Sequence, residues 1–510
     1  MVVNSSLLIV FLLSMATVHT INGEDISDNL VSQNVKDLRV AVIGSGIGGA
    51  SATHFLSVRR HWVQVYRAAK DWKSLGETVQ IDVFEKSDHI GGRLHIVTID
   101  GQSIESGGTI IHSSNKYTVD FVKDLGLGTN VAMSNERLGI YNGKEFVFVE
   151  TSTSWWNGIK MIWRYGFFSL KNMSDALSKM LTDFVSVYQI QDEGKAFKTV
   201  PDLLKALGGD YFVECTDKTS RQIMKEKGVG DELINELLTA VSRNNYGQST
   251  DEINGFTGYV SLAGAQGGSL WNVEGGNYHV PQRLLQKSKA EVHINTKITS
   301  IKKHIDESSG KIAYYLEGAG NETPYDAVIV AAPLEIPSYF ITCAECKDWP
   351  KQSDMGRYQQ TIANFIHKPV DYKYFGYKSA EKLPDIIFTT EEESLNFTTI
   401  EPHGNVNGDP IKPPVYKVFS RKPMTSEMIN QLFITGSQTP EYTSVNWLAY
   451  PHYSPPEKFL PFELDEGVFY VNAIERAASA MEMSAIGGRN AALLAVNYLE
   501  SQKQSQRAHS

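Results

Sequence analysis

Three glycines near the start of the chain have the spacing that lets a backbone hold a phosphate. Gly44, Gly46 and Gly49 lie between an apolar, β-branched run at residues 39–43 and a helix-forming run at residues 50–56. In a strand–turn–helix unit, the first glycine permits a tight turn, the second lets the backbone approach a pyrophosphate, and the third lets the helix pack closely on the strand. The helix N-terminus then offers free N–H groups to the negative charge. The spacing predicts a dinucleotide-binding entry.

A carboxylate suited to ribose hydroxyls ends the next predicted strand, at residues 80–85. Glu85 follows Gly44 by 41 positions (85 − 44), which is longer than the usual unit. We expect residues 58–79 to extend the first helix and its loop, because an insertion on the far side of the unit leaves the phosphate-binding geometry intact. Glu85 is therefore the predicted ribose ligand.

The residues after Glu85 indicate which dinucleotide is bound. Glu85, five further residues and then Gly91-Gly92-Arg93 resemble the acidic residue and Gly-Gly-Arg of the amine-oxidase-like FAD flavoproteins. The resemblance implies non-covalent FAD rather than NAD, with Gly91, Gly92 and Arg93 along the pyrophosphate. It also implies that backbone near Gly108 approaches the flavin, and that Glu475 and the helix after it close the site.

Several further blocks narrow the resemblance to the prenylcysteine oxidase family. Similarity runs from about Arg39 to about Leu499 and is most specific in five segments: residues 107–113, 246–248, 261–267, 274–277 and 472–479. The family implies an α/β fold, a Rossmann-like FAD-binding domain with an inserted α+β substrate domain. We expect the FAD-binding domain to comprise residues 36–112, 268–335 and 462–505, and the substrate domain residues 113–267 and 336–461.

The sequence also predicts the elements that build these domains. They are a strand over 294–301 paired with residues 311–318, a buried strand over 326–333, a last strand over 467–473 leading into a helix over 477–494, a mostly helical region over 116–249, and a mixed, turn-rich segment over 337–453. Strands separated this widely in sequence require a discontinuous cofactor domain.

The resemblance implies oxidative cleavage of the thioether in an S-prenylated cysteine, with oxygen and water as co-substrates. The implied products are cysteine, an isoprenoid aldehyde and hydrogen peroxide. FAD accepts a hydride from the carbon next to sulfur, and the hemithioacetal formed with water then collapses. No Ser–His–Asp or metal constellation is needed, and we predict no metal site.

Candidate substrate residues have two interpretations each. His112 and Glu274 are candidates for placing a water or a proton, or are structural. Tyr246, Tyr259 and Trp271 are candidates for lining an isoprenoid tunnel, or are ordinary core aromatics. Burial of a fifteen-carbon chain supplies about 10 kcal/mol before ordering costs, so tunnel depth should set the preference for chain length.

Aromatic and basic residues alternate over residues 155–171. Three Trp, one Tyr and two Phe are interleaved there with Lys160, Arg164 and Lys171. This pattern predicts either a helix packed under the substrate domain or an interfacial helix that makes peripheral contact with a membrane.

The N-terminus and the sequons indicate the secretory pathway. The apolar run at residues 7–13 has the length of a signal-peptide core, so residues 1–23 are the predicted signal. Asn172, Asn321 and Asn396 are predicted glycosylation sites. We expect the lumen of a lysosome or vacuole, by resemblance, or secretion.

The net charge and the cysteine content argue against a nucleic-acid-binding protein and a disulfide-rich scaffold. A formal net charge of -10 argues against a nucleic-acid partner. Three cysteines exclude a disulfide scaffold, and Cys343 with Cys346 is predicted to form a small structural disulfide or a redox-active pair.

Two rival functions share this architecture. One is an amine or polyamine oxidase, although the substrate-side Lys and aromatic pair common in those enzymes are not identified here. The other is a non-catalytic carrier of prenylated cargo, which would leave the glycines, Glu85, Arg93 and Glu475 unexplained.

Overall fold

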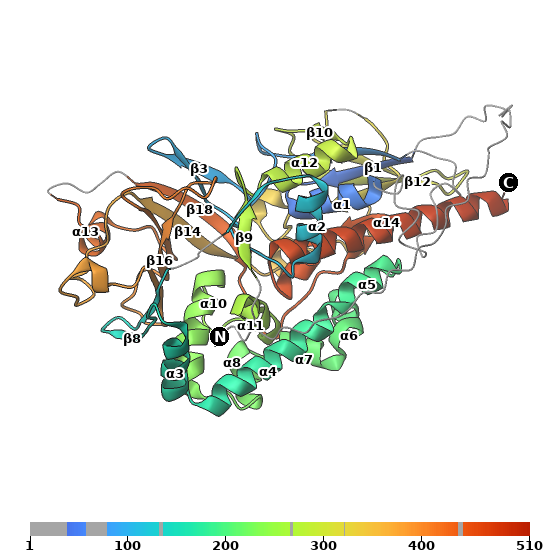
Figure 1. Cartoon of the computed structure of the whole chain (residues 1–510). Helices are drawn as coiled ribbons and strands as arrows, with labels where there is room; N and C mark the ends of the chain where they lie inside the picture. The colour runs from blue at the N-terminus through green and yellow to red at the C-terminus, as the bar shows by residue number, and fades with distance from the viewer. Residues whose placement is uncertain are drawn as a thin grey trace, which may run out of the picture.

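A computed structural model describes residues 38–57, 79–131, 136–265, 269–320, 322–436 and 442–509 (Figure 1). The predicted signal at 1–23, the insertion at 58–78 and Asn321 lie outside the described residues. Within the part of the chain that the structure describes, no helix is both long enough and apolar enough to cross a membrane.

A six-stranded sheet forms the predicted nucleotide-binding unit. Its order is β10 (Glu291–His293), β2 (Val79–Phe84), β1 (Leu38–Ile43), β13 (Ala327–Val330), β20 (Val468–Tyr470) and β19 (Glu463–Asp465). The first five are parallel, and β19 is antiparallel to β20. Helix α1 (Ile47–Ser57) packs against α12 (His279–Ser288) and α14 (Met481–His509). The inner ends of β1 and β2 and all of β13 are buried, which explains their β-branched, apolar composition. The α/β fold is thus confirmed, although the exact domain boundaries stay a prediction.

A second sheet of seven strands lies beside the helical region (Figure 1). Its order is β18 (Thr443–Pro451), β14 (Tyr358–Ile366), β17 (Val415–Ser420), β16 (Thr399–His403), β15 (Ile386–Thr389), β7 (Leu138–Tyr141) and β8 (Phe146–Val149). The prediction that residues 116–249 are mostly helical is wrong for their first third. After α2 (Lys116–Asp124) that stretch forms β6 (Thr129–Val131), β7 and β8. In strands this short, pairing overrides weak local preference: β6 pairs with β9 (Leu270–Val273), β7 with β15 and β8 with β7.

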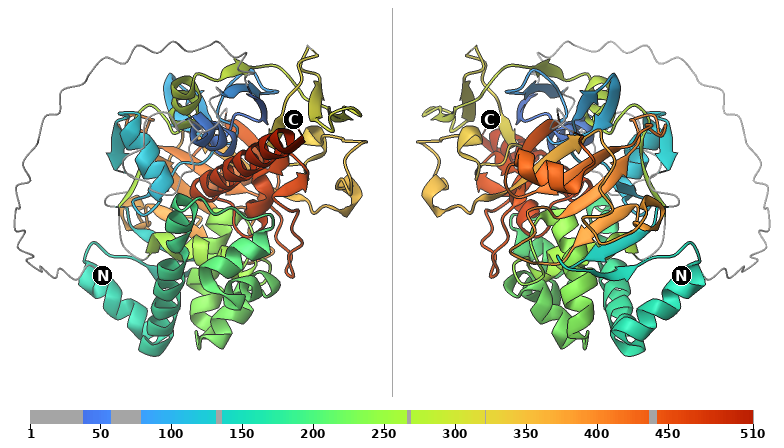
Figure 2. Two further views of the ribbon diagram at one scale, coloured as in Figure 1. Left: turned by 90° about the vertical axis from the view of Figure 1, so that its right-hand side faces the viewer. Right: turned by 90° about the vertical axis from the view of Figure 1, so that its left-hand side faces the viewer.

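The remainder of that stretch is helical, as predicted. It comprises α3 (Ser154–Tyr165), α4 (Phe167–Phe184), α5 (Ser186–Asp192), α6 (Val200–Gly208), α7 (Asp210–Asp217), α8 (Ser220–Glu226), α9 (Asp231–Leu233) and α10 (Thr239–Tyr246). Helix α11 (Gly255–Leu262) follows the predicted stretch. Another helix, α13 (Ser426–Leu432), lies beyond the seven-stranded sheet. In Figure 2, α3 and α4 are the teal helices at the outer edge of the molecule. The ring of Tyr165, at the end of α3, lies 6.3 Å from that of Phe148 on β8.

Smaller hairpins complete the fold. β3 (Ile96–Ile99) pairs with β4 (Gln102–Glu105), and β9 (Leu270–Val273) lies between β5 (Ile111–His112) and β6. The strand predicted over 294–301 is wrong in its bounds, although its predicted partner segment is the one it pairs with. Residues 294–299 turn out of β10, and the strand β11 (Ser300–Ile305) then pairs with β12 (Ile312–Glu317). Asn295 adopts a φ of 55°, which breaks an otherwise alternating run.

Candidate functional site

The first glycine turn packs as tightly as its sequence suggests. Gly44 has a φ of +110°, and an added Cβ would lie 2.6 Å from the carbonyl oxygen of Ala331. A Cβ on Gly49 would collide with the carbonyl oxygen of Gly44, whereas one on Gly46 would meet nothing closer than 3.8 Å. The first and third glycines are therefore required by packing. At Gly46 the backbone stays open, as the approach of a pyrophosphate requires.

A second glycine turn adjoins the first. Gly91 and Gly92 have φ values of 136° and 57°, and Gly91 forms a bridge with Gly46. Glu85 lies beside this junction, where one carboxylate oxygen accepts from the Ser45 backbone N–H at 3.0 Å and from the Ser45 hydroxyl at 2.6 Å. The other oxygen accepts from the Ser87 N–H at 2.8 Å. These bonds fix the carboxylate at the carboxyl end of β2.

An ion pair joins this turn to the end of the last strand. The two terminal nitrogens of Arg93 donate to the two carboxylate oxygens of Glu475 at 2.5 and 3.0 Å. Glu475 is buried, while 33% of the Arg93 side chain is exposed. Burial would lower the pKa of Arg93, but the charge of Glu475 outweighs it and raises that pKa. Arg93 stays charged and has one face turned outward.

This arrangement fits the dinucleotide of FAD. The N-terminus of α1 and the guanidinium of Arg93 supply the donors and the positive charge that a pyrophosphate needs. The Glu85 carboxylate retains an acceptor direction for a ribose hydroxyl. Seven of the residues predicted to bind the cofactor meet at the carboxyl ends of β1 and β2: the five glycines of the two turns, Glu85 and Arg93. An eighth, Glu475, joins them through its ion pair with Arg93.

The segment predicted to approach the flavin lies beside a residue that the sequence analysis missed. Backbone N–H of Gly108 donates to the Arg93 carbonyl at 3.1 Å, which places residues 107–109 against the second glycine turn. The ammonium of Lys417, on β17, lies 3.5 Å from the hydroxyl of Thr109. A lysine at an inward position of the apolar strand β17 is the signal that could have revealed it.

Lys417 lies in a buried group of ionisable side chains. Burial lowers its pKa, although the charges of Glu401 and Glu105 oppose this effect. Burial also raises the pKa of Glu105 to about 7. One oxygen of Glu105 accepts from the Asn277 N–H at 2.5 Å, and the other has no protein partner in the described residues. A proton can therefore be held or exchanged here near neutral pH.

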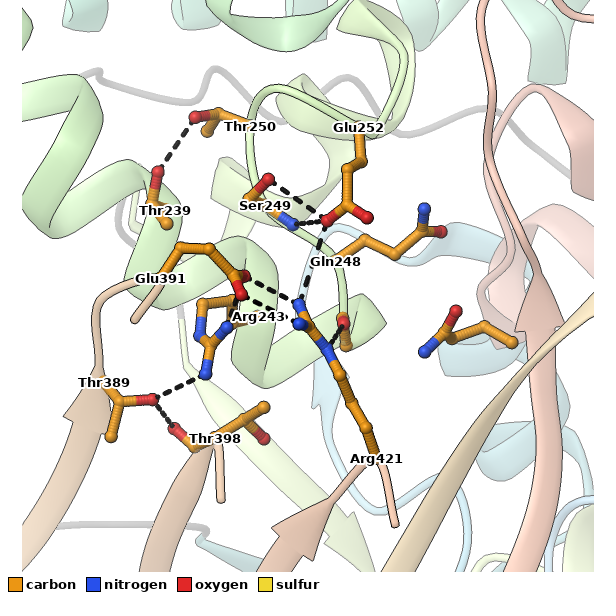
Figure 3. Close-up of polar contacts among 12 residues, drawn as sticks. Thr239, Arg243, Gln248, Ser249, Thr250, Glu252, Thr389, Glu391, Thr398 and Arg421 are labelled. Carbon is orange, nitrogen blue, oxygen red and sulfur yellow. Dashed lines mark hydrogen bonds and ion pairs between the residues drawn. The ribbon is translucent and has the colours of Figure 1, made fainter. Parts of the chain in front are cut away.

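A second buried cation anchors helix α10 to the seven-stranded sheet (Figure 3). Arg243 is 1% exposed and shares the carboxylate of Glu391 with Arg421. Arg243 also donates to the Thr389 hydroxyl at 3.2 Å, and Arg421 donates to the carbonyl of Gly247 at 2.7 Å. Burial lowers the pKa of Arg243 against the opposing charge of Glu391. The cluster fixes the end of α10, where Tyr246 lies.

The two predicted catalytic candidates do not meet. His112 pairs with Leu270 at one end of β9, while Glu274 follows the other end and is exposed. The four-residue length of β9 puts the backbone positions of His112 and Glu274 roughly 13 Å apart along the strand. Their proposed roles stay predictions, and no shared role is possible from these positions.

The three predicted tunnel aromatics lie in separate environments. Tyr246 donates to the Ser479 carbonyl at 3.1 Å and its ring lies 5.1 Å from that of Tyr450. Tyr259 is buried and bonded to the Tyr211 hydroxyl at 2.8 Å, and Trp271 lies on β9. Its bond to Ser479 places Tyr246 beside the segment that follows Glu475. A substrate-lining role for each of the three aromatics stays a prediction.

Modification sites also differ in their surroundings. Asn396 is exposed in the loop between β15 and β16. Asn172 lies within α4 and donates its side-chain N–H to the Gly228 carbonyl at 3.1 Å. Cys343 and Cys346 form a disulfide, and Cys215 is buried as a free thiol.

Comparison with known proteins gives consistent matches over most of the chain. The prenylcysteine lyase family model matches residues 148–507, and a model of the NAD(P)-binding Rossmann-like domain matches residues 42–125. The chain is 37% identical to prenylcysteine oxidase 1 of Mus musculus over 470 residues, which is 90% of this chain and 88% of the mouse protein. It is 34% identical to farnesylcysteine lyase of Arabidopsis thaliana over 476 residues, again 90% and 88% of the two chains.

Solved structures agree on the fold. A putrescine oxidase bound to putrescine superposes with a TM-score of 0.56 at 14% identity, covering 90% of this chain and 98% of that one. A fatty acid isomerase from P. acnes gives a TM-score of 0.59 at 14% identity, covering 89% and 97%. At such identities the likeness supports the architecture and does not select a reaction.

Proposed function

This chain belongs to the prenylcysteine lyase family, and on that basis we propose that it is an FAD-dependent oxidoreductase that cleaves S-prenylated cysteine. The observation that carries the proposal is the joining of both glycine turns, Glu85 and the Arg93–Glu475 pair into one cofactor cradle. A carrier that did not use flavin would have no need for this cradle. Farnesyl and geranylgeranyl substrates both remain within the proposal.

The proposed reaction balances with oxygen and water. Cys–S–CH₂R, O₂ and H₂O give Cys–SH, the aldehyde OHC–R and H₂O₂. When bound, FAD supplies a two-electron acceptor that dioxygen regenerates. The C–S bond breaks only after water has added to the oxidised carbon, and the proton of the resulting hydroxyl passes to the leaving thiolate.

The residues around the cradle support this chemistry by charge and by proton exchange. Lys417 places a buried positive charge beside Thr109, where it would stabilise negative charge developing near the predicted flavin-facing segment. Glu105, with its pKa near 7, can hold or release a proton at its second carboxylate oxygen. Both are assigned as positioning residues.

A product assay tests the proposed substrate. The purified enzyme would be incubated in air with S-farnesyl-L-cysteine, and cysteine, aldehyde and peroxide would be measured in parallel. We expect the three in equal amounts. Peroxide formation from putrescine or another amine, without turnover of the thioether, would instead support the amine-oxidase alternative.

The cellular setting is part of the same proposal. We infer a secretory address, with the lysosome, the vacuole or export as destinations. A disulfide between Cys343 and Cys346 supports an oxidising compartment. A mobility shift on enzymatic deglycosylation, smaller in Asn396→Gln, would test passage through that pathway. Peripheral membrane contact through residues 155–171 belongs to the proposal as well, because a prenylated cysteine partitions into lipid.

A further inference from the structure

Helix α3 presents its apolar side to solvent and its polar side to the protein. Trp155, Ile159, Ile162 and Trp163 follow helical spacing along one side, and all are exposed. A helix of a soluble domain normally has the opposite orientation. Its aromatic residues are therefore not the core of a helix packed under the substrate domain.

The polar residues of α3 hold it in this orientation. Asn157 accepts from the Thr151 N–H at 2.8 Å and donates to the Thr151 carbonyl at 2.8 Å. Lys160 donates to the Val149 carbonyl. Arg164 makes two bonds of 2.6 Å with Glu236. With its polar groups bonded to the body, the helix cannot turn its aromatic side inward without breaking all of these contacts.

The exposed surface continues onto α4. Gly166, with a φ of 79° and open space around it, turns the chain so that Phe167 and Phe168 extend the same surface. Trp163 is 89% exposed, Phe168 75% and Trp155 67%. The α3–α4 aromatic face comprises Trp155, Trp156, Ile159, Ile162, Trp163, Phe167 and Phe168. Its rings leave on the order of 700 Å² in solvent at about 200 Å² per ring, above the 300–600 Å² typical of a monomer.

We propose that the α3–α4 aromatic face inserts into the interfacial layer of a lipid bilayer. The face itself carries no Asp or Glu. Of the three cations from Thr151 to Ser174, Arg164 pairs with Glu236 and Lys171 with Asp175, so the face is close to neutral. Trp flanked by Lys and Arg is the composition that the headgroup region favours. Helices α3 and α4 lie at an outer corner of the molecule, where a planar surface can reach them (Figure 2).

The proposed function explains why the protein would bind a membrane, because a prenylated cysteine accumulates there. Membrane binding itself does not depend on the proposed reaction. Helix α4 packs on α6 and α11, and α11 contacts α10, which carries Tyr246. The helical region thus connects the aromatic face to the side of the cofactor cradle on which Tyr246 lies.

Vesicle binding by the full chain tests the inference without requiring turnover. The probes are phosphatidylcholine vesicles with and without phosphatidylserine. We expect binding to both kinds of vesicle, and at least a tenfold loss of that binding in Trp155→Ser/Trp163→Ser/Phe168→Ser. The matched control, Val131→Ser/Ile305→Ser/Ile434→Ser, removes three exposed apolar side chains elsewhere and should bind as the wild type does.

Unchanged vesicle binding in the α3–α4 triple variant would overturn the inference. The inference would also be overturned if the wild type were a dimer, and if the variant were a monomer whose vesicle binding was unchanged. That result would show that the face binds a second copy of the chain. Brominated lipids provide a test on the unmodified protein, since they should quench its tryptophan fluorescence, and absence of quenching would also overturn the inference. Turnover of monodisperse S-farnesylcysteine, measured in parallel, separates this failure from failure of the proposed function.

Discussion

Arg93 and Glu475 form a bidentate ion pair across 382 residues of sequence. The pair links the turn after β2 to the segment that leads into α14, which makes the two ends of the chain parts of one cofactor cradle. Because Glu475 is buried and also accepts from Asn472 at 2.7 Å and Tyr358 at 3.0 Å, its charge depends on Arg93.

Removing the guanidinium should therefore cost both stability and cofactor. Arg93→Met is expected to lower the free energy of unfolding by about 3–5 kcal/mol, since it leaves a buried carboxylate unpaired. It should also abolish stoichiometric flavin. Arg93→Met/Glu475→Gln should recover part of the stability but none of the flavin. Denaturant unfolding and the flavin-to-protein absorbance ratio measure the two effects, and full flavin content in Arg93→Met would contradict the assignment.

Two alanine substitutions in the first glycine turn should separate folding from binding. Gly46→Ala meets open space and is expected to fold normally while losing FAD affinity by at least tenfold. Gly49→Ala collides with backbone and should fail to fold or be strongly destabilised. Melting temperature and flavin titration distinguish them. Equal melting temperatures for the two variants would contradict the packing argument.

The pKa of Glu105 predicts a pH dependence of stability in the cofactor-free protein. Because burial raises that pKa to about 7 from an ordinary value of 4.5, the folded state favours the neutral acid. The contribution of Glu105 to the free energy of unfolding is fully present below pH 4.5 and is lost as the pH rises to about 7. The free energy of unfolding changes by about 3 kcal/mol over this range. Glu105→Gln should remove this dependence. Parallel pH profiles for the wild type and the variant would show that Glu105 does not titrate in this range.

The Arg243–Glu391 pair offers a test of what positions Tyr246. Glu391→Gln leaves the buried Arg243 unpaired and should destabilise the protein by about 3–5 kcal/mol. The exposed pair Lys171–Asp175 is the control, and Asp175→Asn should cost about 0.5 kcal/mol at most. If Glu391→Gln costs no more than the control, the cluster does not fix α10.

The part of the site that sequence predicted is the part built from local geometry. Gly44, Gly46 and Gly49 are recognisable because a turn and a helix start need them within six residues, and Glu85 follows from the strand beside them. The FAD assignment and Glu475 required a family resemblance, since nothing local links residue 93 to residue 475.

Residues whose roles depend on tertiary contacts were not predicted. Lys417 looks like an ordinary strand residue until β17 packs beside Thr109. The strands β7 and β8 are too short to stand out from the helices that follow, and they are specified by the pairing of β7 with β15 and of β8 with β7. The aromatic face of α3 had two interpretations because amphipathic spacing does not say which side faces the protein; its bonds to Thr151, Val149 and Glu236 decide this.

The central claim is that a prenylated cysteine reduces the flavin held in this cradle. The direct test is to record the visible spectrum of the purified protein and add S-farnesyl-L-cysteine without oxygen. We predict bleaching of the flavin band, with colour and peroxide returning when air is admitted. A yellow protein that stays yellow would contradict the substrate assignment, and a colourless protein that binds the prenyl ligand would contradict the flavoenzyme itself.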